Sequence, residues 1–255
     1  MSNIQPACRA IAAVLCLLAG ISPALASVVL NGTRVVYQEP QREVALRATN
    51  DGTTPSLVQA WIDAGNPDAP PDDANVPFLL TPPLFRIDPG NGQTMRIILA
   101  GEPPPGERET LYWLNVLEVP PTAAPGEGPP NTLQFAFRTR IKLFYRPAPL
   151  DADGASQAAG KVAWRFVRKD GGYALEGSNP TPYHITFVRV KPRVGSRTYA
   201  NGDGGMVAPG GTLELDIGKP ASVPAATPDR VDFSFVNDYG GATDGFVDTR
   251  ATTGH

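Results

Sequence analysis

The stretch LQFAFRTRIKLFYRP, from Leu133 to Pro147, combines two patterns that together decide how the chain is interpreted. Leu133, Phe135 and Phe137 alternate with smaller or polar residues, which is the period of a half-buried β-strand. Basic residues then occur at positions 138, 140 and 142, on the face opposite the three large apolar side chains. The pattern predicts a strand, but alternation alone leaves open whether its apolar face fills this protein's own core or another's.

Similar strand-like segments precede and follow this stretch. The chain contains 26 glycines and 28 prolines, the apolar runs between them mostly alternate, and none sustains a helical period. The predicted strands lie at 28–37, 43–49, 56–63, 77–80, 94–100, 110–119 and 132–145, and then at 161–167, 172–176, 183–190, 211–217 and 230–236. About seven short strands with turns every eight to twelve residues are typical of an immunoglobulin-like sandwich.

A change of composition divides the two groups of strands. The segment LDADGASQAAG (150–160) is interpreted as a linker. The fold class is therefore predicted to be all-β, with an N-terminal domain at 27–148 and a smaller C-terminal domain at 149–255. The tail ATDGFVDTRATTGH (242–255) is predicted to be disordered.

Residues 1–26 have the form of a secretory signal peptide. Arg9 precedes the apolar run AIAAVLCLLAGI, and the small-residue site ALA at 24–26 predicts cleavage before Ser27. The run is too short for a spanning helix, which needs about 20 residues. A lipid anchor on Cys16 is the weaker alternative. Both cysteines lie in this segment, so the mature protein would enter an oxidising compartment without a thiol or a disulfide.

The charge balance and the later segments limit the partners. The formal net charge is −3, and loss of Arg9 makes it about −4, so general affinity for nucleic acid is not expected. No later segment is long and apolar enough to predict insertion into a membrane. Any basic function must therefore be local.

The sequence offers little for catalysis or metal binding. His184 has no partner at ligand spacing and is interpreted as an ordinary surface or strand histidine, and His255 is the last residue. The chain has no G-x-S-x-G elbow, and DADG at 151–154 lacks the rest of a calcium loop and is interpreted as a turn. The prediction is a protein that is not an enzyme and needs no metal or cofactor.

Ordered motifs then indicate a family. TLYWLNVLEVPP (110–121), IKLFYRP (141–147), NPTPY (179–183) and NDYGG (237–241) follow one another along the chain. Together they resemble the periplasmic PapD-like chaperones of chaperone–usher pilus assembly. The longer segment RETLYWLNVLEVPP resembles the family signature around its sixth strand, and the resemblance spans nearly all of residues 28–241.

The resemblance implies a fold and a function. The expected fold is two immunoglobulin-like domains in an L shape, and the expected role is fimbrium biogenesis and cell wall organisation in the periplasm. Such a chaperone binds pilus (fimbrial) subunits that lack their last strand, and lends them its own seventh strand by donor-strand complementation, a form of β-augmentation. It then delivers them to an outer-membrane usher. A self-capping homo-oligomer is the expected alternative state of the free protein.

The resemblance also implies roles for particular residues. Leu133, Phe135 and Phe137 take the donor positions whose side chains enter the groove of the subunit. Arg34 and Lys142 take the places of the two cleft cations that grip the terminal carboxylate of the subunit and fix the register of the added strand.

Further positions match an interdomain salt-bridge network. Glu109, Arg146 and Asp238 fall where the family keeps this network, and Arg86 is expected to be a neighbour. Arg138 and Arg140 have no such assignment, and a solvated strand face is the expectation for both.

The loop before the donor segment indicates a subgroup. Nine residues separate Pro121 from Asn131, which is nearer the short-loop subgroup of the family than the long-loop one. The absence of mature cysteines agrees, because long-loop members commonly carry a disulfide. The bulky donor residues predict subunits with roomy pockets.

Two other classes of protein stay open at this point. A structural or adhesin subunit of a surface fibre would need its own N-terminal donor extension, but the first predicted strand begins directly after the cleavage site. A secreted sugar-active enzyme would need paired carboxylates in a cleft, and the sequence places none convincingly.

Overall fold

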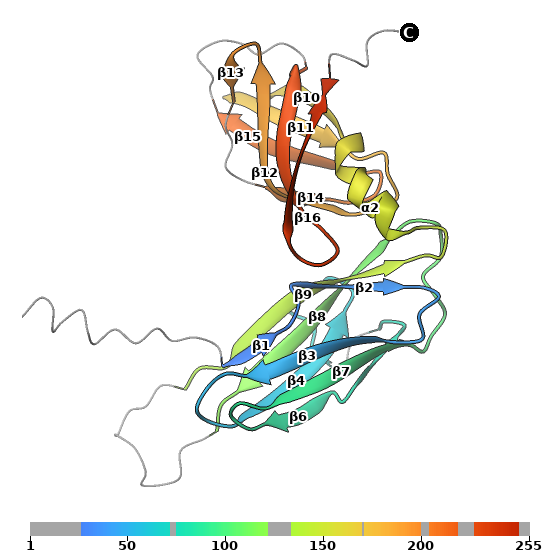
Figure 1. Ribbon diagram of the computed structural model, residues 1–255, viewed down its shortest axis with the longest axis vertical. Helices are drawn as coiled ribbons and strands as arrows, with labels where there is room; N and C mark the ends of the chain where they lie inside the picture. The colour runs from blue at the N-terminus through green and yellow to red at the C-terminus, as the bar shows by residue number, and fades with distance from the viewer. Residues whose placement is uncertain are drawn as a thin grey trace, which may run out of the picture.

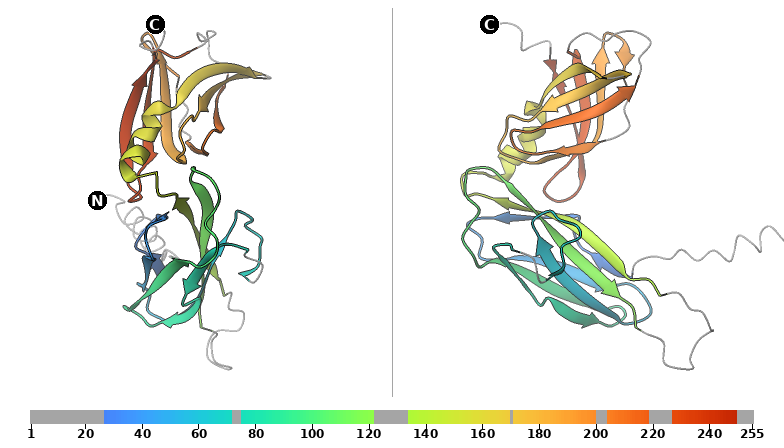
Figure 2. Two further views of the ribbon diagram at one scale, coloured as in Figure 1. Left: turned by 90° about the vertical axis from the view of Figure 1, so that its right-hand side faces the viewer. Right: turned by 180° about the vertical axis from the view of Figure 1, so that it is seen from behind.

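The computed structural model describes residues 27–71, 75–121, 134–169, 171–199, 204–218 and 227–249. These residues form two β-sandwiches that meet at an angle, with the N-terminal sandwich below the C-terminal one in Figure 1. Figure 2 shows from two further sides that the strands of one sandwich are inclined to those of the other. The prediction of an all-β protein with two immunoglobulin-like domains is confirmed.

Two sheets form the N-terminal sandwich. The first runs in the order β1 (Val28–Leu30), β3 (Val44–Asn50), β7 (Gly92–Leu99) and β5 (Phe78–Thr81). The second runs in the order β2 (Arg34–Gln38), β9 (Phe137–Arg146), β8 (Thr110–Val119), β4 (Ser56–Asp63) and β6 (Leu84–Ile87). Paired strands in both sheets are antiparallel, except that β2 runs parallel to β9.

The first predicted strand is divided between these sheets. A single strand over 28–37 was expected, but β1 pairs with β3 while β2 pairs with β9 in the other sheet. The chain crosses from one sheet to the other at Asn31-Gly32-Thr33, where polar and small residues interrupt the apolar alternation. The crossing brings Arg34 beside β9.

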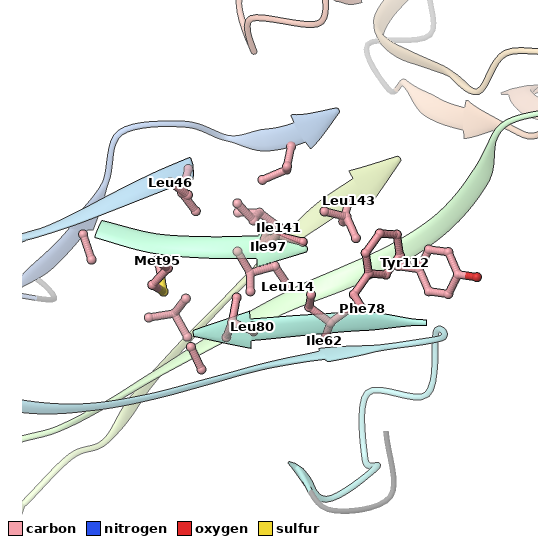
Figure 3. Close-up of a cluster of buried hydrophobic side chains, with 14 of the residues drawn as sticks. Leu46, Ile62, Phe78, Leu80, Met95, Ile97, Tyr112, Leu114, Ile141 and Leu143 are labelled. Atoms are coloured by element: carbon pink, nitrogen blue, oxygen red, sulfur yellow. The ribbon is translucent and has the colours of Figure 1, made fainter. Parts of the chain in front are cut away.

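The alternating residues of both sheets meet in one apolar core. Ile97, Leu114 and Leu143 are fully buried there, and Phe78 contacts Tyr112 edge to face with ring centroids 5.2 Å apart. Figure 3 shows these side chains converging from facing strands. Each such side chain contributes about 1.5–3 kcal/mol of hydrophobic free energy, so core burial alone can hold a domain without disulfides.

The C-terminal sandwich has its own core. One sheet runs in the order β10 (Ala163–Lys169), β11 (Gly172–Ser178) and β15 (Thr212–Gly218). The other runs in the order β13 (Arg197–Thr198), β12 (Ile185–Val194), β16 (Arg230–Val236) and β17 (Ala242–Asp248), and β14 (Gly205–Val207) pairs with the start of β12. Trp164, Phe187 and Phe233 pack between the sheets.

Two sequence predictions in this half were wrong. The predicted linker contains helix α2 (Ala152–Ala158) and the 3-10 turn η2 (Ala159–Lys161), because Asp151 caps the helix by accepting a hydrogen bond from the Gly154 amide at 2.7 Å. DADG is therefore the start of a helix rather than an isolated turn. The predicted disordered tail begins with β17, which pairs with β16 along its length, while residues 250–255 lie outside the described part of the chain.

No helix in the described residues has the length and apolar character that a bilayer span requires.

Candidate functional site

The N-terminal half of β9 is paired on one side only, within the part of the chain that the structure describes. Antiparallel β8 pairs with β9 from Phe137 to Tyr145, but parallel β2 pairs with it only from Lys142 to Arg146. The backbone from Phe137 to Ile141 therefore has a free edge, because β1 lies in the other sheet. An unpaired edge of this kind is a template for a strand from another chain.

Two large apolar side chains are exposed at the start of this segment and just before it. Phe135 is 62% exposed and Phe137 is 39% exposed. Phe137 shares the strand face of Ile141 and Leu143, which are buried in the core, so the apolar face of β9 continues beyond its buried part. Phe135 comes two residues before β9 and continues the same alternation in the sequence. Leu133 lies outside the described residues.

Two partly buried cations lie where the free edge ends. Arg34 and Lys142 are direct partners in the β2–β9 register. Arg34 donates from Nη1 to the Val236 carbonyl at 3.0 Å, and Lys142 donates from Nζ to the Thr186 hydroxyl at 3.0 Å. Both contacts join the N-terminal domain to strands of the C-terminal one.

No carboxylate of the described residues is in contact with these cations. Neither forms an ion pair within the described residues, and Nε of Arg34 is buried without a hydrogen-bond partner there. Burial lowers the pKa of Lys142, and the positive charge of Arg34 lowers it further. Burial also lowers the pKa of Arg34, although Asp238 and Glu109 oppose this effect. An anion bound between the two side chains would offset the free-energy cost of burying these two positive charges side by side.

A buried ion-pair network lies beside the cations. Arg146 at the end of β9 donates from Nε to Glu109 at 2.8 Å, and from Nη1 and Nη2 to both oxygens of Asp238 at 2.7 and 2.9 Å. The other oxygen of Glu109 accepts the backbone amide of His184 at 2.7 Å. Glu109 and Arg146 belong to the N-terminal sandwich and Asp238 and His184 to the other, so the network crosses the domain boundary.

The electrostatics of this network favour the charged form of Arg146. Burial by itself would lower the pKa of Arg146, but hydrogen bonds and charge from Asp238 and Glu109 outweigh burial and raise it. The side chains of Arg146 and Glu109 are almost completely buried. A charge buried in this way is costly unless its partners stay in place.

One predicted member of the network lies elsewhere. Arg86 on β6 pairs with Asp88 two residues later, at 2.9 Å, and both side chains are exposed. Its expected place beside Glu109 and Arg146 is corrected, because β6 is at the far edge of the sheet from β2.

The expectation of a solvated face is corrected for Arg140, whereas Arg138 is exposed as expected but also contacts the neighbouring strands. Arg140 forms an ion pair at 2.6 Å with the buried carboxylate of Asp63, and its guanidinium lies over Trp113 at 4.1 Å from the ring centroid. Arg138 donates to Oδ1 of Asn115 at 2.7 and 3.0 Å and lies over Trp61. These contacts fasten β9 to β8 and β4, and only the pairing of strands brings them together.

The histidine and the acidic residues build no catalytic arrangement that the structure describes. His184 is not a surface residue, since its side chain is buried next to Glu109 and Phe144. Across the described ranges, no three His, Cys, Asp or Glu side chains form a group that could hold a metal ion. The site that the geometry defines is a strand edge that ends beside two partly buried cations, an arrangement suited to binding another chain.

Comparison with known proteins assigns the class. Residues 27–151 match the family "Pili and flagellar-assembly chaperone, PapD N-terminal domain", and residues 157–247 match "Pili assembly chaperone PapD, C-terminal domain". This chain belongs to the PapD-like family of pilus-assembly chaperones. It is a periplasmic chaperone of fimbrial assembly and not an enzyme.

Relatives from several bacteria support the assignment. The chaperone protein FimB/FhaD of Bordetella pertussis is 42% identical over 89% of this chain and 90% of its own length. The probable fimbrial chaperone YadV of Escherichia coli is 39% identical over 88% and 90%. The crystal structure of the CupB2 chaperone of Pseudomonas aeruginosa superposes with a TM-score of 0.70 and 40% identity, covering 86% of this chain and 99% of that one.

A further solved relative contains a bound subunit. The structure of the Salmonella enterica SafA pilin in complex with the SafB chaperone matches with a TM-score of 0.68 and 28% identity, covering 89% of this chain and 98% of the matched one.

Proposed function

We propose that this chaperone binds pilus subunits by donor-strand complementation, with the segment from Leu133 to Ile141 as the donor. The observation that carries the proposal is the free edge of β9, which presents Phe135 and Phe137 and ends at Arg34 and Lys142. The pilin held by the relative SafB is consistent with such a partner. The chaperone would thereby cover subunit core that otherwise aggregates.

The register of β2 suggests the direction of the bound strand. Because β2 is parallel to β9 and begins at Arg34, a subunit strand placed in line with β2 would also run parallel to β9. Its C-terminal carboxylate would then reach Arg34 and Lys142, which would bind it through charge-assisted hydrogen bonds. Anchoring the carboxylate fixes the register, because a slip of one residue turns every donor side chain to the wrong face.

Two terms would drive the association. Burial of each donor phenylalanine is worth about 1.5–3 kcal/mol before the cost of ordering. Backbone hydrogen bonds along the free edge add affinity that does not depend on the sequence of the subunit. Because the backbone hydrogen bonds do not depend on the subunit sequence, one chaperone can bind several different subunits, provided that their grooves have roomy pockets for the phenylalanines.

The buried network would hold the shape of the cleft. Glu109, Arg146 and Asp238 join both domains, so their contacts oppose a change in the interdomain angle. Arg34 and Lys142 also contact the C-terminal domain, and the distance between the domains therefore sets how these two cations face a ligand.

Several finer features complete the proposal. Cleavage before Ser27 would release the mature domains at 27–148 and 149–255 into the periplasm. The nine-residue segment 122–130 and the cysteine-free mature chain support the short-loop subgroup. The chaperone would pass its subunit to an outer-membrane usher, and the free edge of β9 would favour a self-capping homo-oligomer when no subunit is present.

The test is capture of the fimbrial subunit encoded beside this chaperone after co-expression in the periplasm. Phe135→Glu should abolish recovery of a one-to-one complex, because a charge forced into an apolar groove costs several kcal/mol. Phe246→Glu is the matched control, since Phe246 is 53% exposed on β17 of the other domain. Equal recovery with Phe135→Glu and the wild type would refute the donor assignment.

A further inference from the structure

Glu118 is a buried carboxylate at the end of β8, outside the cleft. It is 6% exposed. Its Oε2 accepts the backbone N–H groups of Ser27 at 3.1 Å and Val28 at 3.0 Å. Its Oε1 accepts the Ser56 hydroxyl at 2.9 Å and the Ser27 hydroxyl. Two consecutive backbone N–H groups on one oxygen form the kind of concave site that binds anions.

The residues that the structure describes give this carboxylate no matching cation. No Lys, Arg or His side chain among the described residues forms an ion pair with Glu118. The four groups that bind it are neutral amides and hydroxyls as long as residue 27 follows a peptide bond. A buried carboxylate without a countercharge is a costly arrangement, and a positive charge on the nitrogen of Ser27 would lie 3.1 Å from Oε2 of Glu118.

We propose that the pocket formed by Glu118, Ser56 and Val28 is the binding site for the α-ammonium group that signal-peptide removal creates on Ser27. Hydrolysis of the Ala26–Ser27 bond consumes one water, leaves a carboxylate on Ala26 and frees the Ser27 amine, which takes up a proton at neutral pH. The nitrogen that was an amide donor to Glu118 then becomes the missing cation. The proposal rests on the predicted cleavage site and not on subunit binding.

The place of the pocket gives this ion pair a consequence. Glu118 is the register partner of Phe137, so the pocket lies beside the proposed donor segment. The same pocket fastens β1, through Ser27 and Val28, to β8 and β4. Removal of the signal peptide thus completes the N-terminal domain beside the edge that faces subunits, and an uncleaved chain lacks that ion pair.

The first test is a double-mutant cycle on mature protein prepared with defined N-termini by cleavage of a fusion partner. One chain begins at Ser27 and the other carries one added alanine before it, which moves the ammonium group and leaves an amide at Ser27. The added alanine should lower the Tm by about 5 °C, as expected for the loss of one charge-assisted contact. In a Glu118→Gln background the same addition should change the Tm by less than about 2 °C. Equal shifts in both backgrounds would overturn the proposal.

The second test needs no substitution and covers the case in which Glu118→Gln does not fold. Periodate rapidly oxidises an N-terminal serine whose amine and hydroxyl are accessible. In the folded protein both groups contact Glu118, so oxidation of Ser27 should be at least about tenfold slower than in urea. Equal rates would contradict the proposal. Mass spectrometry of periplasmic protein checks the cleavage itself, and any N-terminus other than Ser27 would also overturn it.

Discussion

The two halves of β9 belong to one continuous strand but differ in which strands pair with them and in how far their side chains are buried. From Lys142 to Arg146 the strand is paired on both sides, and Leu143 and Tyr145 are buried in the core of their own domain. Within the described part of the chain, the segment from Phe137 to Ile141 is paired with β8 alone, and the large side chain of Phe137 remains substantially exposed. The C-terminal half of β9 thus contributes to the core of its own domain, whereas the N-terminal half leaves a backbone edge free to pair with another chain.

The difference shows what alternation can and cannot specify. A period of two residues assigns side chains to a common face, and Phe137, Ile141 and Leu143 do share one. Whether that face is covered depends on the opposite sheet and on the neighbouring strand. Here β2 begins only at Arg34, beside Lys142, and the first half of β9 is left with a free edge.

The largest expected effect on stability comes from a substitution in the buried half of β9. Arg146→Ala should lower the free energy of unfolding by about 3–5 kcal/mol, because it leaves Glu109 buried without its cation and breaks the contact with Asp238. Urea denaturation would measure the loss. Arg86→Ala is the control, since the exposed Arg86–Asp88 pair should contribute less than about 1 kcal/mol. A loss equal to that of the control would show that the network is not structural.

The cations at the junction of the two halves should matter for binding more than for folding. Arg34→Ala or Lys142→Ala should each cost about 2–5 kcal/mol of subunit affinity, and the double variant less than the sum, because both would bind one carboxylate. Stability of the free protein should change little or rise, since two like charges no longer share a cleft. Isothermal titration or copurification with the subunit measures the effect.

The control substitution for that experiment must be a basic residue that has no structural contact within β9 and its neighbouring strands. Arg140→Ala is unsuitable, because it would remove the partner of buried Asp63. Lys191→Ala, on an exposed position of β12, changes one positive charge far from the free edge. Wild-type affinity in both cleft variants would exclude the anchor role.

A smaller effect on the free energy of unfolding is expected from a substitution at Arg140, whose ion pair joins β9 to β4. Arg140→Ala should lower the free energy of unfolding by about 1–3 kcal/mol at neutral pH, because Asp63 keeps its charge and loses its cation. Burial by itself would raise the pKa of Asp63, but hydrogen bonds from Arg140, Asn115 and the Gly65 backbone outweigh burial and lower it.

This lowered pKa gives the same pair a dependence on pH. Its stabilisation is complete above the unfolded-state pKa, which is about 3.9, and is lost as the pH falls through the lower folded-state value. The difference in the free energy of unfolding between the wild type and Arg140→Ala should therefore become smaller as the pH falls below 4. A gap that stays constant in urea denaturation down to pH 2 would contradict this account.

The smallest effect is expected at the exposed end. Phe135→Ala should change the free energy of unfolding by less than about 0.5 kcal/mol, because this side chain has no core to leave. Leu143→Ala, on the same face of the buried half, should cost about 2–5 kcal/mol. Thermal unfolding of both variants measures the comparison directly. Similar losses would mean that Phe135 fills the core of its own domain.

Much of the fold could be predicted from local pattern, and the failures have identifiable causes. β4, β8 and β16 lie where alternation predicted them. Helix α2 was missed because its seven residues are too few to show a helical period, although Asp151 is a capping signal. β17 was missed because Gly245 and polar residues obscure its alternation, which pairing with β16 overrides.

The candidate site divides in the same way. Alternation indicated that Phe135 and Phe137 share one face, and the resemblance supplied roles for Arg34 and Lys142. The predictions for Arg86 and Arg140 were wrong because the order of the strands in the sheet, which decides the partners of both side chains, was not known from the sequence. Cross-strand contacts connect residues that sequence distance does not relate.

The sequence by itself determined the strand period, the two-domain all-β class, the family and the expected export signal, because these depend on local spacing and ordered motifs. Tertiary structure alone decided three further features of the described residues: which segment of β9 has a free edge, which cations there have no carboxylate in contact, and which buried carboxylate receives the backbone of Ser27. The physical reason is that burial, pairing and charge compensation depend on which strands become neighbours. That choice is made by the whole chain, when its apolar faces are covered together.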